Sequence, residues 1–290
     1  VFLFLLFLLI GACGDTSDKS VGSANEKSST VEIQMQADAS SVVAASPLTF
    51  SEACMSVVNM CWYEIEKSFG DSDLPTVIVN KSLSLEHVAN INITVDKDAS
   101  TNVEDVQLSI RSLPDNSRHE EYQQFLYGLL DKVKAAGWRH YYSPSDPRIS
   151  GSQMDKIKLP DEVMGDYVMS HPWLDPDYRL DLDRWLKFGS FHTWYFFKDD
   201  NYLTVQAWSR NSDKAPAERG TYLVSLHFTT QSEYWRAIFD KAEEKDQWSK
   251  LLPKKLKEYQ AVREAREKKA RAAGIEIDQS YQDPVIRALQ

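Results

Sequence analysis

Histidines are the residues of this sequence best suited to metal binding or proton transfer. No two of them have the HExxH or HxH spacing of a zinc site, and His119 with Glu120 and Glu121 lacks a second histidine. The sequence therefore predicts no local metal site, and it leaves open only a site assembled from distant segments. The six histidines are His87, His119, His140, His171, His192 and His227.

A run of aspartates at Asp175, Asp177, Asp181 and Asp183 could offer oxygen ligands to calcium, which is a hard cation. The run lacks the glycine of a calcium-binding loop, and a tryptophan stands on either side of it. We therefore interpret the run as a solvated loop, and we expect no metal and no cofactor.

The sequence contains no motif typical of a catalytic site. There is no GxSxG elbow, no P-loop and no dinucleotide-binding glycine pattern, so we predict no catalytic residue. A set of aromatic residues either lines a ligand-binding groove or forms an ordinary core. This set comprises Tyr141, Tyr142, Trp173, Trp185, Trp194, Tyr195 and Trp208.

Cys54 and Cys61 form an even pair, which favours a disulfide in an oxidising compartment. Such a bond would close a short loop and contribute about 2–3 kcal/mol to stability. A helix over this segment would hold the two Cα atoms about 10.5 Å apart, too far for a disulfide. The pair is therefore either a disulfide in a loop or bent strand, or two buried thiols.

The first ten residues, VFLFLLFLLI, have about half the length of a membrane-spanning helix. They match the apolar core of a secretory signal peptide, and small residues follow them. The sequence from Ile10 to Cys13 resembles the lipobox of bacterial lipoproteins, in which an aliphatic residue and two small residues precede a cysteine. The resemblance implies that residues 1–12 are a signal peptide and that Cys13 is lipidated.

The same resemblance implies a location in the cell envelope. In lipoproteins of Gram-negative bacteria, an aspartate directly after the cysteine favours retention in the inner membrane, whereas Gly14 stands there in this sequence. We therefore expect an outer-membrane lipoprotein that faces the periplasm. Each buried methylene of an acyl chain contributes about 0.8 kcal/mol, so two or three chains on Cys13 would hold the protein on the bilayer.

Composition divides the rest of the chain into three parts. Residues 13–47 have no aromatic residue and no sustained apolar period, which predicts a flexible tether. Residues 48–253 contain all eight Trp residues and predict a globular α+β body, and residues 254–290 predict a basic helix and tail. A formal net charge of -10 and a pI near 5.2 argue against nucleic-acid binding. The acid excess lies in the body, which favours a basic protein partner.

Periodicity within the body predicts both strands and helices. Alternating apolar residues predict strands at 88–95, 106–113 and 222–228, and a hairpin formed by 191–197 and 202–208. Two amphipathic helices follow capping-box spacings at 117–137 and 230–245.

A strand followed by a capped helix occurs twice, which indicates either two related strand-strand-helix halves or a coincidence. We expect an α+β fold with a mainly antiparallel sheet and two packed helices. A third helix at 254–273 is charged, with a net charge of +5 over its first eighteen residues. It is either docked by its first turns alone, or it contacts an anionic membrane or an acidic partner.

The lipobox, the long tether, the acidic body and the lack of a catalytic motif together look like the periplasmic immunity lipoproteins that neutralise membrane-attacking toxins. This resemblance implies a non-enzymatic protein-binding module with a protein partner. The alternative that we retain is an envelope enzyme or a small-ligand-binding lipoprotein whose site is dispersed along the sequence.

Overall fold

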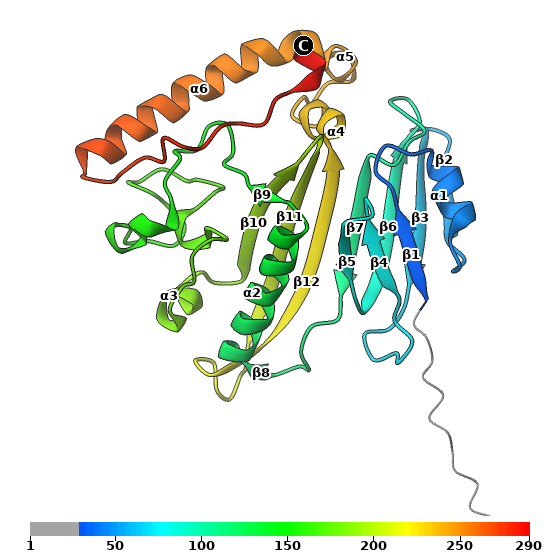
Figure 1. Ribbon diagram of the computed structural model, residues 1–290, viewed down its shortest axis with the longest axis horizontal. Helices are drawn as coiled ribbons and strands as arrows, with labels where there is room; N and C mark the ends of the chain where they lie inside the picture. The colour runs from blue at the N-terminus through cyan, green and yellow to red at the C-terminus, as the bar shows by residue number, and fades with distance from the viewer. Residues whose placement is uncertain (1–28) are drawn as a thin grey trace, which may run out of the picture.

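Two β-sheets organise residues 29–290, the part of the chain that the computed structural model describes (Figure 1). All neighbours in the larger, nine-stranded sheet are antiparallel. The order of its strands is β2 (Ser51–Met55), β3 (Met60–Glu66), β6 (Val88–Asp96), β7 (Asp105–Ile110), β12 (Arg219–Thr230), β11 (Asn201–Asn211), β10 (Phe191–Lys198) and β9 (Arg139–His140), and β8 (Ser117–Arg118) pairs with β12.

The smaller sheet places β4 (Thr76–Val79) between β1 (Thr30–Ile33) and β5 (Leu83–Leu85). The helix α1 (Ala39–Ala45) follows β1, and the side chain of Asp38 caps it by accepting from the backbone N–H of Ser41. The tether predicted for residues 13–47 is therefore wrong from Thr30 onward. The local sequence was a weak indicator of β1, because this strand is short and its partner β4 lies more than 40 residues away.

The core forms where alternate side chains of the large sheet meet the elements that cover it. Ile91 and Ile93 of β6 are buried while Asn90 and Asn92 between them are only half-buried, as expected for a strand with one covered face. The helix α2 (His119–Ala135) packs across the other half of the sheet, where the rings of Tyr122 and Tyr222 stack 4.4 Å apart (Figure 1). These contacts form the larger of two hydrophobic clusters in residues 29–290.

The predicted helix at 117–137 is present but begins later. Ser117 and Arg118 pair with β12 as β8, and the backbone N–H of Arg118 donates to Glu121 Oε2 at 3.0 Å. The capping pair is thus one residue later than the predicted Ser117 and Glu120. Gly137 follows the helix with a positive φ of 90°, a backbone conformation that favours glycine.

The predicted hairpin of β10 and β11 is confirmed, with Asp199 in a left-handed conformation at its turn. The helix predicted at 230–245 is wrong in length. Thr230 caps α4 (Gln231–Arg236) by accepting from the N–H of Glu233 at 3.3 Å, but the chain then leaves the helix before α5 (Ala242–Lys245).

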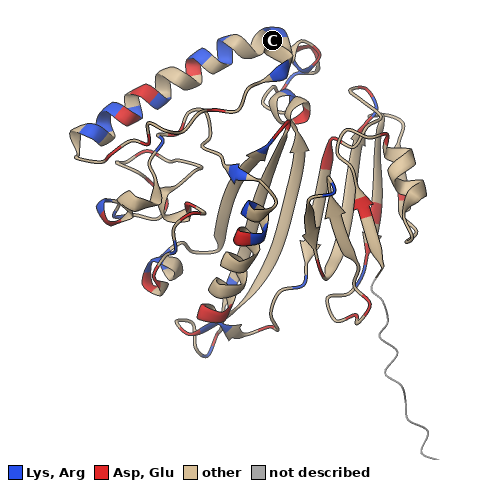
Figure 2. Ribbon diagram, in the orientation of Figure 1, with Lys and Arg blue, Asp and Glu red and all other residues tan. Residues whose placement is uncertain are grey.

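The last helix, α6 (Trp248–Ala272), crosses one end of the large sheet (Figure 1). The predicted boundary between body and tail after Pro253 is therefore wrong, because Pro253 lies within this helix. Lysines, arginines and acids alternate along α6 (Figure 2), yet Arg263, Glu267 and Ala270 in its second half are buried. Docking by the first turns alone is thus also wrong.

The α+β class with a mainly antiparallel sheet is confirmed. The two strands that precede the capped helices, β7 and β12, pair in the middle of the large sheet, and because they are antiparallel their helices follow from opposite ends. Their helices differ, since α2 has 17 residues and α4 has 6. The likeness between the two halves therefore extends to the strands but not to the helices.

Candidate functional site

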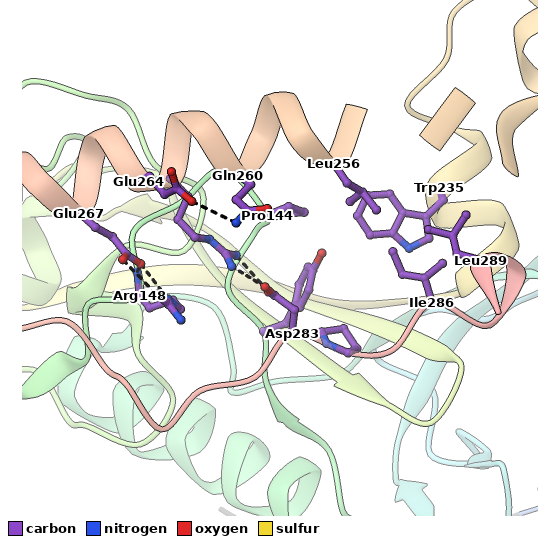
Figure 3. Close-up of a pocket in the computed structure, with 13 residues that line it drawn as sticks. Pro144, Arg148, Trp235, Leu256, Gln260, Glu264, Glu267, Asp283, Ile286 and Leu289 are labelled. Atoms are coloured by element: carbon purple, nitrogen blue, oxygen red, sulfur yellow. Dashed lines mark hydrogen bonds and ion pairs between the residues drawn. The ribbon is translucent and has the colours of Figure 1, made fainter. Parts of the chain in front are cut away.

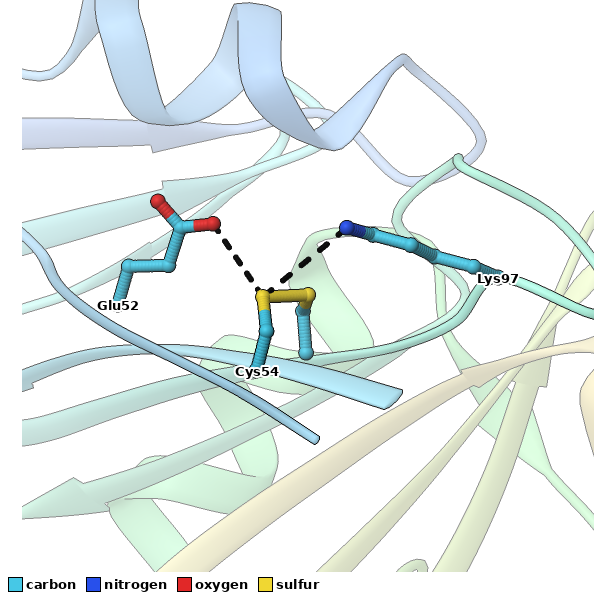
Figure 4. The surroundings of a disulfide bond; sticks show 4 residues. Glu52, Cys54 and Lys97 are labelled. Carbon is cyan, nitrogen blue, oxygen red and sulfur yellow. Dashed lines mark hydrogen bonds between the residues drawn. A yellow bond between two sulfur atoms is a disulfide. The ribbon is translucent and has the colours of Figure 1, made fainter. Parts of the chain in front are cut away.

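A disulfide between Cys54 and Cys61 links β2 to β3 (Figure 4). The two residues face each other in the strand register, with Cα atoms 4.1 Å apart. Of the two alternatives that the sequence left open, the structure contains the disulfide, and an antiparallel hairpin supplies the approach that a helix would have prevented. Glu52 lies beside the two sulfurs, but bonded sulfurs offer no thiolate to a metal.

Three of the six histidines are buried: His171 packs against Trp173 and Phe188, and His119 and His192 lie near Trp185. His119 Nδ1 is 2.9 Å from Tyr222 Oη, and His192 Nε2 donates to the carbonyl of Trp185 at 3.0 Å. Burial lowers the pKa of His192 to about 4, so this ring is neutral at pH 7. Among residues 29–290, neither His119 nor His192 hydrogen-bonds to a carboxylate. These two histidines support packing around Trp185.

The predicted aromatic groove is not a single site. Trp173, Trp185 and Trp194 are buried in the main core, which fits the alternative of ordinary packing. Tyr141 belongs to a second, smaller core. The remaining three residues of the set are dispersed: Tyr142 lines one hollow, Tyr195 lines another, and Trp208 is half-buried on β11.

His140 lies beside carboxylates in a hollow of about 460 Å³, which we call the acidic hollow. His140 Nδ1 is 3.5 Å from Asp175 Oδ1. Burial lowers the pKa of His140, although the charges of nearby aspartates oppose this effect. The acidic hollow is lined by Lys134, Trp138, Arg139, His140, Tyr142, Ser150, Asp175, Asp177, Tyr178, Asp278, Ser280 and Tyr281.

The aspartate run is only partly the solvated loop that the sequence predicted. Asp175 is buried and accepts from the backbone N–H groups of Gly151 at 2.7 Å and Asp177 at 3.0 Å. Asp181 caps a short helix, α3 (Leu182–Lys187), by accepting from Arg184 N at 2.8 Å. The aspartates of the run therefore stabilise the local backbone by accepting its hydrogen bonds. The run also brings Asp175 and Asp177 into the acidic hollow.

A groove of about 440 Å³ lies between α6 and the C-terminal segment (Figure 3). Trp235, Leu256 and Ile286 line its apolar end. At its other end, Arg263 pairs with Asp283 and Arg148 pairs with Glu267. Because these charged groups already form ion pairs with each other, they hold α6 against the body and are not free to act as catalytic groups.

A second groove of about 340 Å³ follows the free part of β10, and we call it the edge groove. Three of its large apolar side chains are exposed: Tyr167 by 70%, Phe191 by 53% and Met169 by 42%. Asp161 and Lys187 are its charged residues. Apolar exposure of this kind on a folded surface commonly marks an interaction site.

The edge groove also exposes backbone hydrogen-bonding groups. Ser190 O accepts from Ser209 N, which shows that every second residue of β10 bonds to β11 through its backbone. The backbone N–H and C=O groups of the residues between them point away from β11, toward the open edge. Tyr195 O uses this outward direction to accept from Tyr141 N at 2.9 Å. The backbone groups of Phe191 and Thr193 have no such partner among residues 29–290.

Comparisons with protein-family models, with curated proteins and with solved structures found no significant match for this chain. Among residues 29–290, no helix has the length and apolar character needed to cross a membrane. Cys13, the predicted lipidation site, lies outside the described residues.

Proposed function

We propose that this protein is a membrane-anchored, non-enzymatic lipoprotein of the periplasm that binds a protein partner along the edge groove. The observation that carries the proposal is the free edge of β10 beside exposed Tyr167, Met169 and Phe191. An extended segment of a partner can pair with the outward backbone groups of Phe191 and Thr193, as added strands do at sheet edges.

The apolar side chains of the edge groove would then provide the contact area. Aromatic residues and methionine are enriched at protein interfaces because they bury much surface at low entropic cost. The net charge of -10 favours encounter with a basic partner. The resemblance to immunity lipoproteins suggests a secreted toxin as that partner, and the lipid on Cys13 would keep the protein at the membrane such a toxin attacks.

A photo-crosslinking residue introduced at Met169 tests this proposal in cells that produce the full chain. The matched control carries the crosslinker at Phe69, which is equally exposed at 42% but follows β3, near the other edge of the large sheet. We expect one protein to crosslink from position 169 and not from 69. The purified form of that protein should bind the Phe191→Glu variant at least tenfold more weakly than the wild type, and the Phe69→Glu variant as tightly.

Two results would refute the edge groove as the binding site. One is equal crosslinking from positions 169 and 69. The other is equal binding of the captured partner to the wild type and to Phe191→Glu, with circular dichroism showing that the variant is folded.

The groove beneath α6 favours a second candidate function, the binding of a small amphipathic ligand. Its apolar end could hold a hydrocarbon portion, and exposed Gln260 and Glu264 lie on the polar side of its lining. Fluorescence of N-phenyl-1-naphthylamine, compared between the wild type and Leu256→Arg, measures such binding. An equal signal from both proteins would remove this candidate.

A further inference from the structure

The acidic hollow combines three carboxylates with aromatic rings in one concave surface. Asp175, Asp177 and Asp278 all line it. Asp175 is held by backbone N–H groups, and Asp278 accepts from the backbone and the hydroxyl of Ser280 at 2.8 and 2.6 Å. Hydrogen bonds of this kind outweigh burial and lower the pKa of Asp278, so it is ionised at neutral pH.

The negative charge of the hollow is only partly neutralised by its own cations. Lys134 Nζ pairs with Asp177 at 3.2 Å and also with Asp131, outside the hollow, at 3.4 Å. Arg139 instead stacks on the ring of Phe197, 4.5 Å from its centroid. Because burial lowers the pKa of His140, its ring adds no positive charge at pH 7. The field of the three aspartates also adds to burial in raising the pKa of Tyr142.

Aromatic rings form a continuous part of the lining. The ring of Tyr142 lies 4.3 Å from that of His140 and 4.8 Å from that of Tyr281, to which it is nearly perpendicular at 88°. Tyr178 is a further lining residue. Faces of tyrosine rings attract cations, and the planar guanidinium of arginine stacks on them better than a lysine ammonium does.

Trp138 adds an independent indication of a ligand. It lines the hollow and is only 3% exposed, and its Nε1 has no hydrogen-bond partner among the described residues. A buried donor without a partner is costly, so a ligand that offers an acceptor would be favoured here. The hollow thus suits a group that carries both a positive charge and a carbonyl oxygen.

We propose that the acidic hollow binds an arginine residue of a peptide or protein. The guanidinium would lie among the aspartates and tyrosine rings, and a backbone carbonyl of the same residue would accept from Trp138 Nε1. This inference does not depend on the edge groove, because the edge groove and the acidic hollow share no lining residue.

The test titrates N-acetyl-arginine amide into the full mature protein in detergent, with ¹⁵N-labelled tryptophan. The matched neutral probe is N-acetyl-citrulline amide, which keeps the shape and lacks the charge. We expect a saturable shift of the Trp138 indole signal, assigned with Trp138→Phe, and at least tenfold weaker binding of the citrulline probe. The indole signals of the buried Trp185 and Trp194 should not move.

Variants of single carboxylates complete the test. Asp278→Asn should weaken binding of the arginine probe at least threefold, and Asp177→Asn provides a second, more exposed site if the first variant does not fold. The control is Asp183→Asn, an exposed acid of the same run that does not line the hollow. Its affinity should equal that of the wild type.

Three outcomes would overturn the proposal. The first is an unmoved Trp138 signal at saturating probe, and the second is equal affinity for the arginine and citrulline probes. The third concerns the source of the cation. Tighter binding of free L-arginine than of the amide would assign the hollow to the free amino acid instead of a peptide.

Discussion

Arg148 and Glu267 form a two-pronged ion pair that joins the loop after β9 to the second half of α6. Arg148 Nε donates to Glu267 Oε1 at 2.7 Å, and Nη2 donates to Oε2 at 3.0 Å. Arg271 Nη2 also donates to Oε2 at 3.0 Å, and the side chain of Glu267 is only 3% exposed. Paired hydrogen bonds of this geometry fix orientation as well as position, so this contact sets how α6 lies on the body.

Glu267→Gln should destabilise the protein by about 2–3 kcal/mol, because it leaves a partly buried guanidinium without its counter-charge. Urea unfolding followed by tryptophan fluorescence measures this change. The control is Glu258→Gln, which removes an exposed pair with Lys255 on the same helix and should cost less than about 0.5 kcal/mol. Equal effects of the two substitutions would show that the buried pair does not hold α6.

Stability should fall in mild acid because His192 resists protonation in the folded state. Burial lowers its pKa from 6.5 to about 4, and the residue is only 1% exposed. Between these two values the unfolded chain binds a proton that the folded protein does not, so the folded state loses stability as the pH falls from 6.5 to 4. The loss amounts to about 3 kcal/mol over this window.

His192→Gln isolates this effect from that of other titrating groups. Between pH 7 and pH 4.5, the variant should lose about 2–3 kcal/mol less free energy of unfolding than the wild type. Exposed His87 is the control, and His87→Asn is chosen because asparagine tolerates its positive φ of 58°. If His192→Gln and the wild type lose equal stability, His192 does not resist protonation.

Reduction of the disulfide should destabilise the hairpin of β2 and β3. Removing the link between Cys54 and Cys61 costs about 2–3 kcal/mol in the loop-entropy model. Unfolding of the Cys54→Ser, Cys61→Ala double variant measures the cost. Alkylation of the denatured wild type before and after reduction checks the bond itself: both cysteines should react only after reduction, and full labelling without reductant would contradict the disulfide.

Lipidation of Cys13 is the prediction on which the membrane location depends. Cys13→Ser should move the protein from the membrane to the soluble fraction, because no acyl chain would then hold it on the bilayer. Cys54→Ser should leave fractionation unchanged. Mass spectrometry of the mature protein should show an acylated N-terminal cysteine, and an unmodified Cys13 that still follows residues 1–12 would refute the lipoprotein interpretation.

Local patterns in the sequence predicted the elements whose character is set by their own residues. The alternation of β6, the hairpin of β10 and β11 and the apolar stripe of α2 can each be read within one short window, because burial on one face imposes a period of 2 or 3.6 residues. The α+β class and the antiparallel large sheet followed from these windows. The separation of Cys54 and Cys61 likewise allowed a disulfide but could not decide it.

Only the tertiary structure decided what depends on distant partners. The short strand β1 is stabilised by pairing with β4, and α6 is docked by Arg148, far from it in sequence. His140 and Asp175 in the acidic hollow are 35 positions apart in the sequence. The segment between them has no apolar periodicity from which their proximity could be predicted. The periodicity of a short segment indicates which of its own residues are buried. Whether a hollow or a strand edge stays open depends instead on whether distant segments of the chain cover it.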